Sequence, residues 1–413
     1  MSAPSATVDP APGATSAATG VTRRLPGWSG RVASAAAAVA VAWHWTAGLG
    51  PVVAVPFQPE AAARTAPAAA VESVYLERFA SNNETRHMHA SSAYSARPGA
   101  LAAFWYGGSA EGARDVAIYS SRFDDGRWSP PRVVVERTAV QTALGRPIRK
   151  LGNATVHRHP DGRLWLLFVS VSVGGWAGSA INLIESRDDG LSWSAPRRLV
   201  TSPFLNLSTL VRTNAFRYAD GSIGLPVYHE FIGKFGELLR VGGDGRILSK
   251  TRLSSGRLAL QPDAVLIDAE RAVLLLRNAG ALPRRLLRST TADAGRSWTD
   301  PQPVQVPNPD AALDAIALDG DRLLAVINDT ETGRQRLTLA VSDDLGNHWR
   351  PLTALADVDH GSPPGADGLH EYSYPWLLRA ADGTYHVLFT WNRERIRHVE
   401  FNQTWLDRLA AGR

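Results

Sequence analysis

One eight-residue pattern occurs three times in this chain: a hydroxyl residue, any residue, Asp, any residue, Gly, two residues and Trp. Its copies begin at Ser186, Thr291 and Ser342, and a shortened copy runs from Ser121 to Trp128. In such a segment the Asp side chain accepts hydrogen bonds from backbone N–H groups, Gly supplies a positive φ, and Trp packs against the neighbouring sheet. Each copy follows a strand-like apolar run. The pattern therefore predicts a hairpin in a repeated β-unit, with a role in the fold and none in chemistry.

A second repeated element is a turn, usually Asp-Gly, that leads into a short apolar strand. Its six copies begin near Gly99, Asp161, Asp220, Asp268, Asp319 and Asp382. They are spaced roughly 50 to 60 residues apart, which is enough for one four-stranded blade of a propeller. The sequence therefore predicts an all-β, six-bladed β-propeller over residues 74–402. The alternative is a jelly roll or a pair of sandwich domains.

Composition narrows the functional classes. The chain is 44% hydrophobic and 20% charged, as expected for a globular protein with a sizeable core. Its net charge of +5 comes with no run of Lys and Arg interleaved with aromatics, so no nucleic-acid partner is predicted. Cysteine is absent, which excludes disulfides, Cys-ligated metals and thiol nucleophiles. His87 and His89 lack a carboxylate at ligand spacing, so neither a metal nor another cofactor is predicted.

The N-terminal part of the chain differs from the rest. Arg23, Arg24 and Arg31 precede a long apolar stretch, the pattern of an export signal or membrane anchor. A buried helix of the folded domain is the alternative. We expect an exported protein, periplasmic or extracellular, that contacts a membrane only through this segment. The predicted parts outside the propeller are a disordered basic N-terminus (1–31), a signal or transmembrane segment (32–57), an Ala/Pro linker (58–73) and a C-terminal tail (403–413).

The Trp-containing turns on six blades resemble the Asp-box, or BNR repeat, of the sialidase (neuraminidase) superfamily. Within it, the chain is similar to a bacterial "predicted neuraminidase" branch, and the resemblance covers residues 74 to 402. The matching segments are His89–Ser92, Trp105–Gly108, Glu111–Gly112, Asp115–Val116, Asn308–Pro309, Asp314–Ala315 and Glu371–Pro375. The resemblance implies an exo-acting glycoside hydrolase that acts on glycans, on sialic acid or on another sugar, without a cofactor.

The resemblance also implies a set of catalytic roles. In sialidases three arginines bind the substrate carboxylate, a tyrosine paired with a glutamate is the nucleophile, and an aspartate is the acid/base. Guanidinium forks suit a carboxylate because they donate two parallel hydrogen bonds. A neutral tyrosine oxygen meets less repulsion than Asp or Glu at a sugar that carries a carboxylate, and sialidases are an exception to the two-carboxylate rule.

Several positions of this chain match those roles. Arg277, at the end of an apolar strand, matches the second arginine, and Arg334, just before the next such strand, matches the third. Tyr372 or Tyr374 stands where the nucleophilic tyrosine is expected. Glu230 resembles the carboxylate that activates this tyrosine.

The first part of the site departs from the family. Sialidases open with Arg-Ile-Pro, whereas this chain has His89-Ala90-Ser91 at that place. A site without the guanidinium group of this first arginine suits a different sugar, such as a deoxyhexose or a uronate-containing glycan. His89 then becomes a catalytic candidate. Asp115, in the loop after the first strand pair, is the best match for the acid/base, and Glu111 is the second choice and a predicted substrate contact.

Polar residues also recur at strand ends near the starts of the repeats. Propellers collect such groups at one end of the central channel, so we expect them to line the cleft and bind substrate. The predicted binding residues of this kind are Asn153, Asn214, Gln261 and Asp314. Two other functions remain open on the same fold: a non-catalytic glycan-binding propeller, and a His-dependent rhamnosidase or lyase that acts on acidic polysaccharide. The sequence makes no prediction of the oligomeric state.

Overall fold

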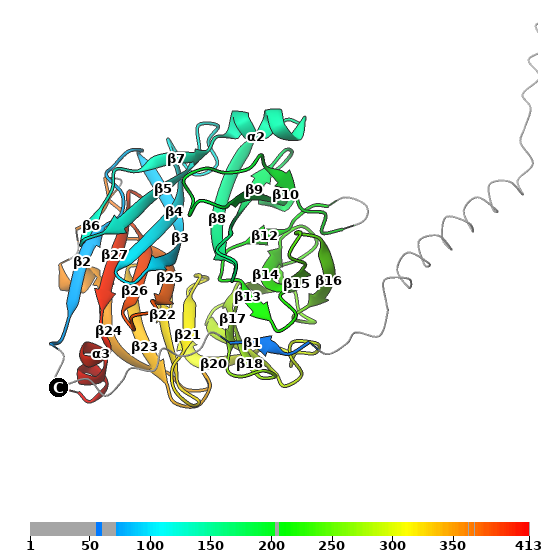
Figure 1. Ribbon diagram of the computed structural model, residues 1–413. Coiled ribbons are helices and arrows are strands. Elements are labelled where there is room, and N and C mark those ends of the chain that lie inside the picture. The colour runs from blue at the N-terminus through cyan, green and yellow to red at the C-terminus, as the bar shows by residue number, and fades with distance from the viewer. Residues whose placement is uncertain (1–54, 60–71, 203–205, 362, 367, 413) are drawn as a thin grey trace, which may run out of the picture. The chain divides into compact units, whose positions relative to one another are not determined.

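The computed structural model describes residues 55–59, 72–202, 206–361, 363–366 and 368–412. These residues form six antiparallel sheets around a common centre (Figure 1). Each sheet is built mainly from one repeat of the sequence, blades three and six each add one strand from the N-terminal side, and the innermost strand of each sheet contacts those of neighbouring sheets. The prediction of an all-β, six-bladed propeller is confirmed, and the jelly roll and paired sandwiches are excluded.

The first three blades follow in chain order. Blade one contains β3 (His87–Arg97), β4 (Ala100–Gly108), β5 (Ala117–Asp124), β6 (Arg127–Trp128) and β7 (Arg132–Val135). Blade two contains β8 (Lys150–Arg158), β9 (Leu164–Val171), β10 (Ser179–Ser186) and β11 (Arg197–Arg198). Blade three contains β12 (Leu210–Val211), β13 (Phe216–Tyr218), β14 (Ile223–His229), β15 (Phe235–Val241) and β16 (Ile247–Arg252), with β1 (Phe57–Gln58) added to β13.

The other three blades complete the ring. Blade four contains β17 (Ala259–Leu266), β18 (Ala272–Asn278), β19 (Arg285–Thr291) and β20 (Gln302–Pro307). Blade five contains β21 (Asp314–Ala317), β22 (Leu323–Ile327), β23 (Arg336–Ser342) and β24 (Arg350–Asp357). Blade six contains β25 (Tyr372–Arg379), β26 (Tyr385–Trp391), β27 (Arg395–Phe401) and β2 (Tyr75–Phe79). The short helices are α2 (Arg137–Leu144), α3 (Gln403–Ala410), η1 (Trp176–Gly178) and η2 (Val358–His360).

Blade six takes strands from both ends of the propeller sequence. Strand β2 pairs with β27 over its full length, from Tyr75 opposite Phe401 to Phe79 opposite Arg397. Figure 1 shows these two strands side by side in blue and red. A strand from the start of the propeller sequence thus closes the ring by backbone hydrogen bonds and becomes the outer edge of blade six.

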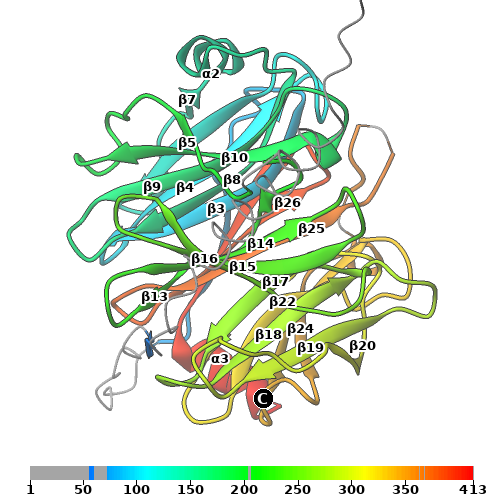
Figure 2. The same cartoon turned by 90° about the vertical axis from the view of Figure 1, so that its right-hand side faces the viewer.

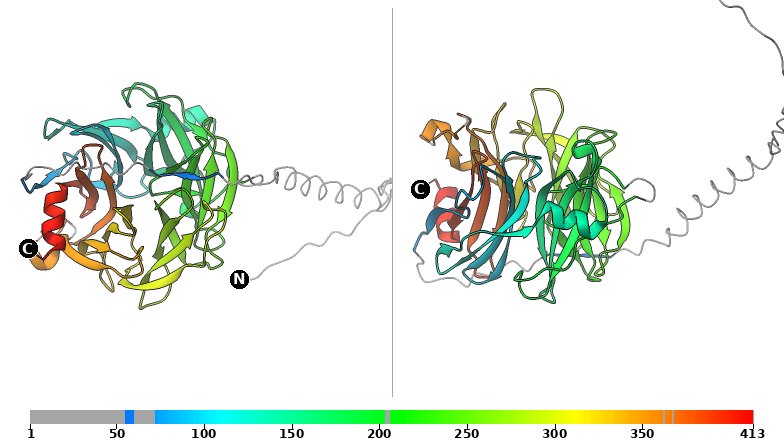
Figure 3. Two further views of the ribbon diagram at one scale, coloured as in Figure 1. Left: turned by 60° about the horizontal axis from the view of Figure 1, so that its bottom comes forward. Right: turned by 90° about the horizontal axis from the view of Figure 1, so that it is seen from above.

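The predicted boundaries outside the propeller have different outcomes. Nearly all of residues 1–73 lie outside the described residues, so export and anchoring stay predictions. Phe57, the last residue of the predicted signal segment, instead starts β1 and is buried against blade three. The predicted C-terminal tail forms α3, whose Leu406 is buried and which lies against β24 (Figure 3). Within the described part of the chain, no helix is long and apolar enough to cross a bilayer.

The Trp-containing turns have the geometry that the sequence predicts. The carboxylate of Asp188 accepts a hydrogen bond from the backbone N–H of Ser192 at 2.9 Å, and Asp293 and Asp344 accept the equivalent bonds at 2.9 Å. The tryptophan of the third copy, Trp349, is buried in the core between blades four and five. These turns hold the outer hairpins together, and their role is structural.

Candidate active site on the innermost strands

Four of the innermost strands are interrupted at the same level. Each loses its regular register by a β-bulge: β3 after His89, β8 around Asn153, β17 around Gln261 and β25 around Tyr374. Gln261 and Tyr374 have positive φ angles of 47° and 53°, as does Ala90 in β3, which is rare for such residues. Bulges are enriched next to active sites because they re-aim side chains.

Side chains of blade three support two of these bulges. Each bulge contains a proline, and its freed carbonyl needs a donor. Arg212 Nη2 donates to the carbonyl of Pro375 at 2.5 Å, and Thr213 Oγ1 donates to that of Pro262 at 2.6 Å. Arg212 is only 3% exposed and its guanidinium lies 5.2 Å from the centre of the Tyr374 ring. The contacts of Arg212 therefore hold the bulge that carries Tyr374 in place.

The hydroxyl of Tyr374 is the centre of a hydrogen-bonded cluster. Arg277 Nη1 lies 3.4 Å from this oxygen and Gln261 Nε2 lies 3.5 Å from it. The guanidinium of Arg334 lies 5.6 Å from the centre of the Tyr374 ring. Burial would raise the pKa of Tyr374, but the positive charges of Arg277 and Arg334 outweigh it and lower that pKa. This tyrosine is therefore easier to ionise than an ordinary one.

Arg277 is itself held in place. Its Nε donates to Asp310 Oδ1 at 2.5 Å and its Nη1 donates to Gln261 Oε1 at 3.1 Å. Burial works against its charge, but Tyr374 and Asp310 raise its pKa. Among the described residues, its Nη2 has no hydrogen-bond partner. One arm of the guanidinium thus positions Tyr374, and the other is available to a ligand.

A second group of charges surrounds Glu371. Its Oε1 lies 3.1 Å from Arg334 Nη1, and its Oε2 lies 2.5 Å from Arg393 Nε. Arg393 also reaches Glu111 Oε2, at 2.9 Å, and so connects blade six to the loop of blade one. Burial would raise the pKa of Glu371, but the nearby His89 ring, the hydrogen bond from Arg393 and the charge of Arg334 lower it to about 2.

This group predicts a pH-dependent contribution to stability. The pKa of Glu371 lies below its usual 4.5 in the folded protein, so its ionised form stabilises the fold above that pH. We expect Glu371→Gln to lower the free energy of unfolding by about 3 kcal/mol at pH 7, since each pKa unit is worth about 1.4 kcal/mol. The difference should shrink between pH 4.5 and about 2. Urea unfolding at several pH values measures both quantities.

The control for this prediction is an ion pair at the surface. Glu331 pairs with Arg285 at 2.9 Å but is mostly exposed. Glu331→Gln should therefore change the free energy of unfolding by less than about 1 kcal/mol. Equal losses in the two variants, or a Glu371→Gln loss that does not depend on pH, would contradict the prediction.

His89 occupies the place of the missing first arginine. Its ring lies edge-on to Tyr374, with centres 4.4 Å apart, and it is only 1% exposed. Burial lowers its pKa well below the usual value, against the raising effect of Glu371, so the ring is neutral. A buried neutral ring cannot touch a substrate or hold its carboxylate. The direct catalytic role expected for His89 is therefore not supported, and the residue packs beneath the nucleophile candidate.

The two tyrosine candidates are separated by their environment. Tyr372 is 0% exposed and packs on Trp391, with ring centres 4.7 Å apart, in the core between blades five and six. Its hydroxyl lies 3.2 Å from His370 Nδ1. Tyr374, two residues later, reaches the arginine cluster because of the bulge. The structure therefore brings Tyr374 and not Tyr372 to the candidate site.

Two of the residues predicted to line the cleft, Asp314 and Gln261, are buried and stabilise the inner strands instead. Asp314 is 0% exposed and accepts hydrogen bonds from Leu377 N at 2.8 Å and from Asn214 Nδ2 at 3.3 Å. Gln261 is 3% exposed and has the role described above. As buried residues, Asp314 and Gln261 cannot contact a ligand in this structure, contrary to expectation.

Asn153 lies on blade two and is half-buried. Its Nδ2 donates to Val211 O at 2.9 Å and to the hydroxyl of Tyr228 at 3.1 Å. Tyr228 in turn accepts from Gln261 Nε2 at 3.3 Å. Burial raises the pKa of Tyr228, so this phenol stays protonated. Asn153 is thus connected to the Tyr374 cluster through Tyr228.

Three more carboxylates were predicted for the site. Glu230 is half-buried, and among the described residues its carboxylate has no hydrogen-bond partner; burial raises its pKa, against Lys234 and Arg277. Glu111 is held by Arg393. Both oxygens of Asp115 accept hydrogen bonds from Ser109, at 2.9 Å each, and Asp115 is exposed on the blade-one loop. Its hydrogen bonds within the described part of the chain go to Ser109 alone.

Two arginines of the site were missed in the sequence. Arg212 follows the very short strand β12, and Arg393 lies in the β26–β27 hairpin. Neither stands in a recognisable motif, and the chain holds many arginines among its 44 basic residues. The sequence feature that could have identified Arg393 is its position in the last hairpin, just after β26, the strand that pairs with β25.

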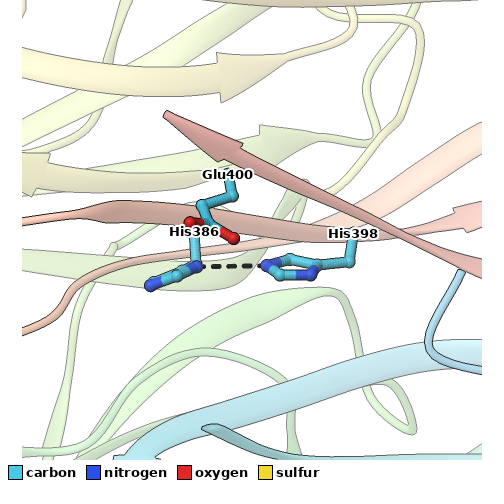
Figure 4. Close-up of side chains that lie close together, drawn as sticks. All are labelled: His386, His398 and Glu400. Atoms are coloured by element: carbon cyan, nitrogen blue, oxygen red, sulfur yellow. Dashed lines mark hydrogen bonds between the residues drawn. The ribbon is translucent and has the colours of Figure 1, made fainter. Parts of the chain in front are cut away.

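A possible metal site was tested separately. His386, His398 and Glu400 of blade six offer ligand atoms within 4.8 Å of one another (Figure 4). His386 Nδ1 and His398 Nε2 are 3.1 Å apart, and Trp128 Nε1 donates to His398 Nδ1 at 3.2 Å. An indole nitrogen only donates, so the proton of His398 is on Nε2 and points at His386.

This arrangement does not fit a metal. A metal-bound histidine donates a hydrogen bond through its other nitrogen, whereas that nitrogen of His398 accepts one. Glu400 is also paired with Arg78, at 2.6 Å, whose charge opposes a cation. His386 and His398 instead form a hydrogen-bond chain with Trp128, and this chain joins blade six to blade one.

Comparisons with known proteins agree with this geometry. Residues 99–387 match the family described as the BNR repeat-like domain. Among curated protein sequences, none matches this chain significantly. Among solved structures, the chain is similar to a Hadza microbial sialidase, Hz136, with a TM-score of 0.63 at 17% identity over 80% of this chain and 69% of that one.

Two further structures are similar. A protein of unknown function from Dyadobacter fermentans has a TM-score of 0.62 at 14% identity, over 79% of this chain and 97% of that one. The NanB sialidase from Streptococcus pneumoniae has a TM-score of 0.58 at 10% identity, over 78% of this chain and 70% of that one. At such identities the likeness concerns the fold, while the family match covers more than half of the sequence. The chain therefore belongs to the BNR repeat-like domain family, on a propeller of the sialidase type.

Proposed function

We propose that this protein is an exo-acting glycoside hydrolase of the sialidase superfamily, with Tyr374 as its nucleophile. The observation that carries the proposal is the environment of the Tyr374 hydroxyl. It lies 3.4 Å from Arg277 Nη1, with Arg334 near its ring, and the two charges lower its pKa. A tyrosine is a weak nucleophile until such a lowered pKa or a neighbouring base activates it.

In the proposed reaction, the Tyr374 oxygen attacks the anomeric carbon of the terminal sugar and forms a covalent bond as the glycosidic C–O bond breaks. The phenol proton passes to Glu230, whose free carboxylate faces the charge of Arg277. Asp115 protonates the departing glycan oxygen. Water then attacks the same carbon, gives a proton to Asp115, and releases Tyr374, which recovers its proton from Glu230. Two displacements retain the anomeric configuration.

We assign the terminal sugar to the acidic class. Arg277 Nη2 and Arg393 Nη2 have no hydrogen-bond partners among the described residues, and such donors suit a carboxylate. The first arginine of the family is missing from this chain, but Arg393 supplies a third guanidinium group in addition to those of Arg277 and Arg334. Sialic acid is the first candidate, and a terminal uronate is the second.

A non-catalytic glycan-binding role is the second candidate function. It is favoured by Asp115, whose carboxylate is held by Ser109 and not by the cluster around Tyr374. The His-dependent rhamnosidase or lyase is not carried forward, because His89 is buried.

The experiment is a release assay with the purified protein. Sialyllactose, a glycan ending in a uronate and one ending in rhamnose are incubated separately, and released monosaccharides are separated by chromatography. We expect a free acidic monosaccharide whose first-formed anomer, observed by NMR, has the configuration of the substrate. Binding to the glycans without any released sugar would replace the hydrolase by the binding protein. Inversion of the anomer would reject Tyr374 as the nucleophile.

A further inference from the structure

A pocket of about 490 Å³ lies on the flank between blades one and two. Its walls are the β4–β5 loop at Gly112–Arg114, helix α2, the segment Pro147–Arg149 before β8, and Ser172 after β9. Helix α2 lies next to β7 at the outer part of blade one in both views (Figures 1 and 2). Three of the lining side chains are arginines, Arg114, Arg137 and Arg149, and the lining contains no acidic residue.

The arginines of this pocket are largely unused by the protein. Arg114 and Arg149 are exposed, and among the described residues their guanidinium groups make no hydrogen bond or ion pair. Arg137 is fixed by the backbone: its Nε donates to Arg114 O at 2.8 Å and its Nη1 donates to Ile148 O at 2.9 Å. Its Nη2 is left without a partner in the described part of the chain. This positive pocket therefore has free donors, and the hydrogen bonds of Arg137 hold one of them, its Nη2, in place.

The loop that lines the pocket also contacts the candidate active site. The loop after β4 places Glu111 on Arg393, at 2.9 Å, and places the next residues, Gly112 to Arg114, in the pocket wall. Gly112 has a φ of +77° and packs on Lys150, because a Cβ added to it would lie 3.2 Å from the Lys150 Cδ atom. Lys150 opens β8, the strand that carries Asn153. A ligand that extends outward from Tyr374 over this loop would meet the arginines.

We propose that this pocket is a subsite for an anionic group, a carboxylate or a sulfate, on a second sugar of the glycan whose terminal residue lies at Tyr374. The proposal rests on the proposed function for the place of that terminal residue. Planar guanidinium groups bind carboxylate and sulfate oxygens through paired hydrogen bonds, and several unpaired cations together favour a polyanionic ligand. The subsite would make the protein prefer acidic glycans over neutral ones.

Binding is measured by calorimetry on the full chain, so that no turnover is needed. The probes are a galacturonate hexamer, its fully methyl-esterified neutral form, a sulfated chondroitin hexasaccharide and inorganic sulfate. The variant is Arg114→Gln/Arg149→Gln, since both side chains are exposed and make no contacts that hold the fold. We expect the variant to bind the preferred acidic hexamer about 30-fold more weakly than the unchanged protein does. Its affinity for the neutral form should equal that of the unchanged protein. The sulfated chondroitin hexasaccharide carries both carboxylates and sulfates, so tighter binding of it than of the galacturonate hexamer would show that sulfate adds to the binding of carboxylate.

The matched control is Arg127→Gln/Arg187→Gln, which removes the same charge from exposed arginines outside the pocket. It should bind every probe as the unchanged protein does. Equal weakening in both double variants, or no binding of either acidic hexamer to the unchanged protein, would overturn the subsite. Tight binding of inorganic sulfate alone would also overturn it, because the site would then take a free anion. Loss of hexamer binding only in the pocket variant, with no sugar released by any protein, would keep the subsite and reject the hydrolase.

Discussion

Tyr374→Phe is expected to lower kcat/KM for the released acidic sugar by about 10³-fold or more, a loss of about 4 kcal/mol of transition-state stabilisation. The substitution removes the attacking oxygen that Arg277 and Gln261 hold. It keeps the ring that packs on His89 and over Arg212, so the fold should be preserved. The measurement is steady-state kinetics on the substrate found in the release assay, with the unfolding midpoint recorded alongside.

The chain offers a matched control two residues away. Tyr372→Phe also removes one hydroxyl from the same strand, but this hydroxyl lies in the core beside His370. We expect kcat/KM within about threefold of the unchanged protein, and a loss of about 1 kcal/mol of stability at most. Similar activities for Tyr374→Phe and the unchanged protein would reject the nucleophile. A larger loss in Tyr372→Phe would mean that the wrong tyrosine has been assigned.

Trp376→Ala should cause the largest loss of stability, about 4 kcal/mol, because it leaves a large cavity in the core. Trp376 is 0% exposed and packs with Trp105 and Met88 between blades six and one. Its Nε1–H donates to the carbonyl of Ala93 at 2.9 Å, so the variant also leaves this acceptor without its partner. Urea unfolding followed by fluorescence and circular dichroism measures the change in midpoint.

Two variants test the cause of that loss. Trp376→Phe fills most of the cavity and should recover more than half of the lost free energy. Trp298→Ala removes the same side chain from a half-buried position in an outer hairpin, where Trp298 donates to Gly295 O at 3.2 Å. It should cost less than Trp376→Ala. Equal losses for both alanine variants would show that burial between the blades is not what makes Trp376 important.

The fold was predictable because its signals are local. An Asp two residues before a Gly with positive φ acts within one hairpin, as the hydrogen bond from Ser192 N–H to Asp188 shows. Regular spacing of these hairpins then gave the number of blades. The pairing of β2 with β27 was not predicted, because the two strands lie at opposite ends of the propeller sequence and carry no shared motif.

The candidate site was only partly predictable. Arg277 and Arg334 were found through the resemblance to sialidases, which expects binding arginines beside these apolar strands, and both do lie near Tyr374. Asp314 and Gln261 were expected to line the cleft because they lie near the starts of the repeats, but they are buried, since their polar atoms bond to backbone groups and neighbours of the inner strands. A polar residue at a strand end can face the central channel or be buried in the protein beneath it, and the sequence does not distinguish these two positions.

The sequence by itself determined the repeated hairpin, the number of blades and the family resemblance, because each depends on residues close together in the chain. Only the tertiary structure decided between Tyr372 and Tyr374, since a one-residue bulge in β25 reverses which side chain faces the arginines. It also brought in Arg393, whose partners Glu371 and Glu111 come from other segments. Long-range contacts of this kind follow from the ring closing on itself, which no local pattern records.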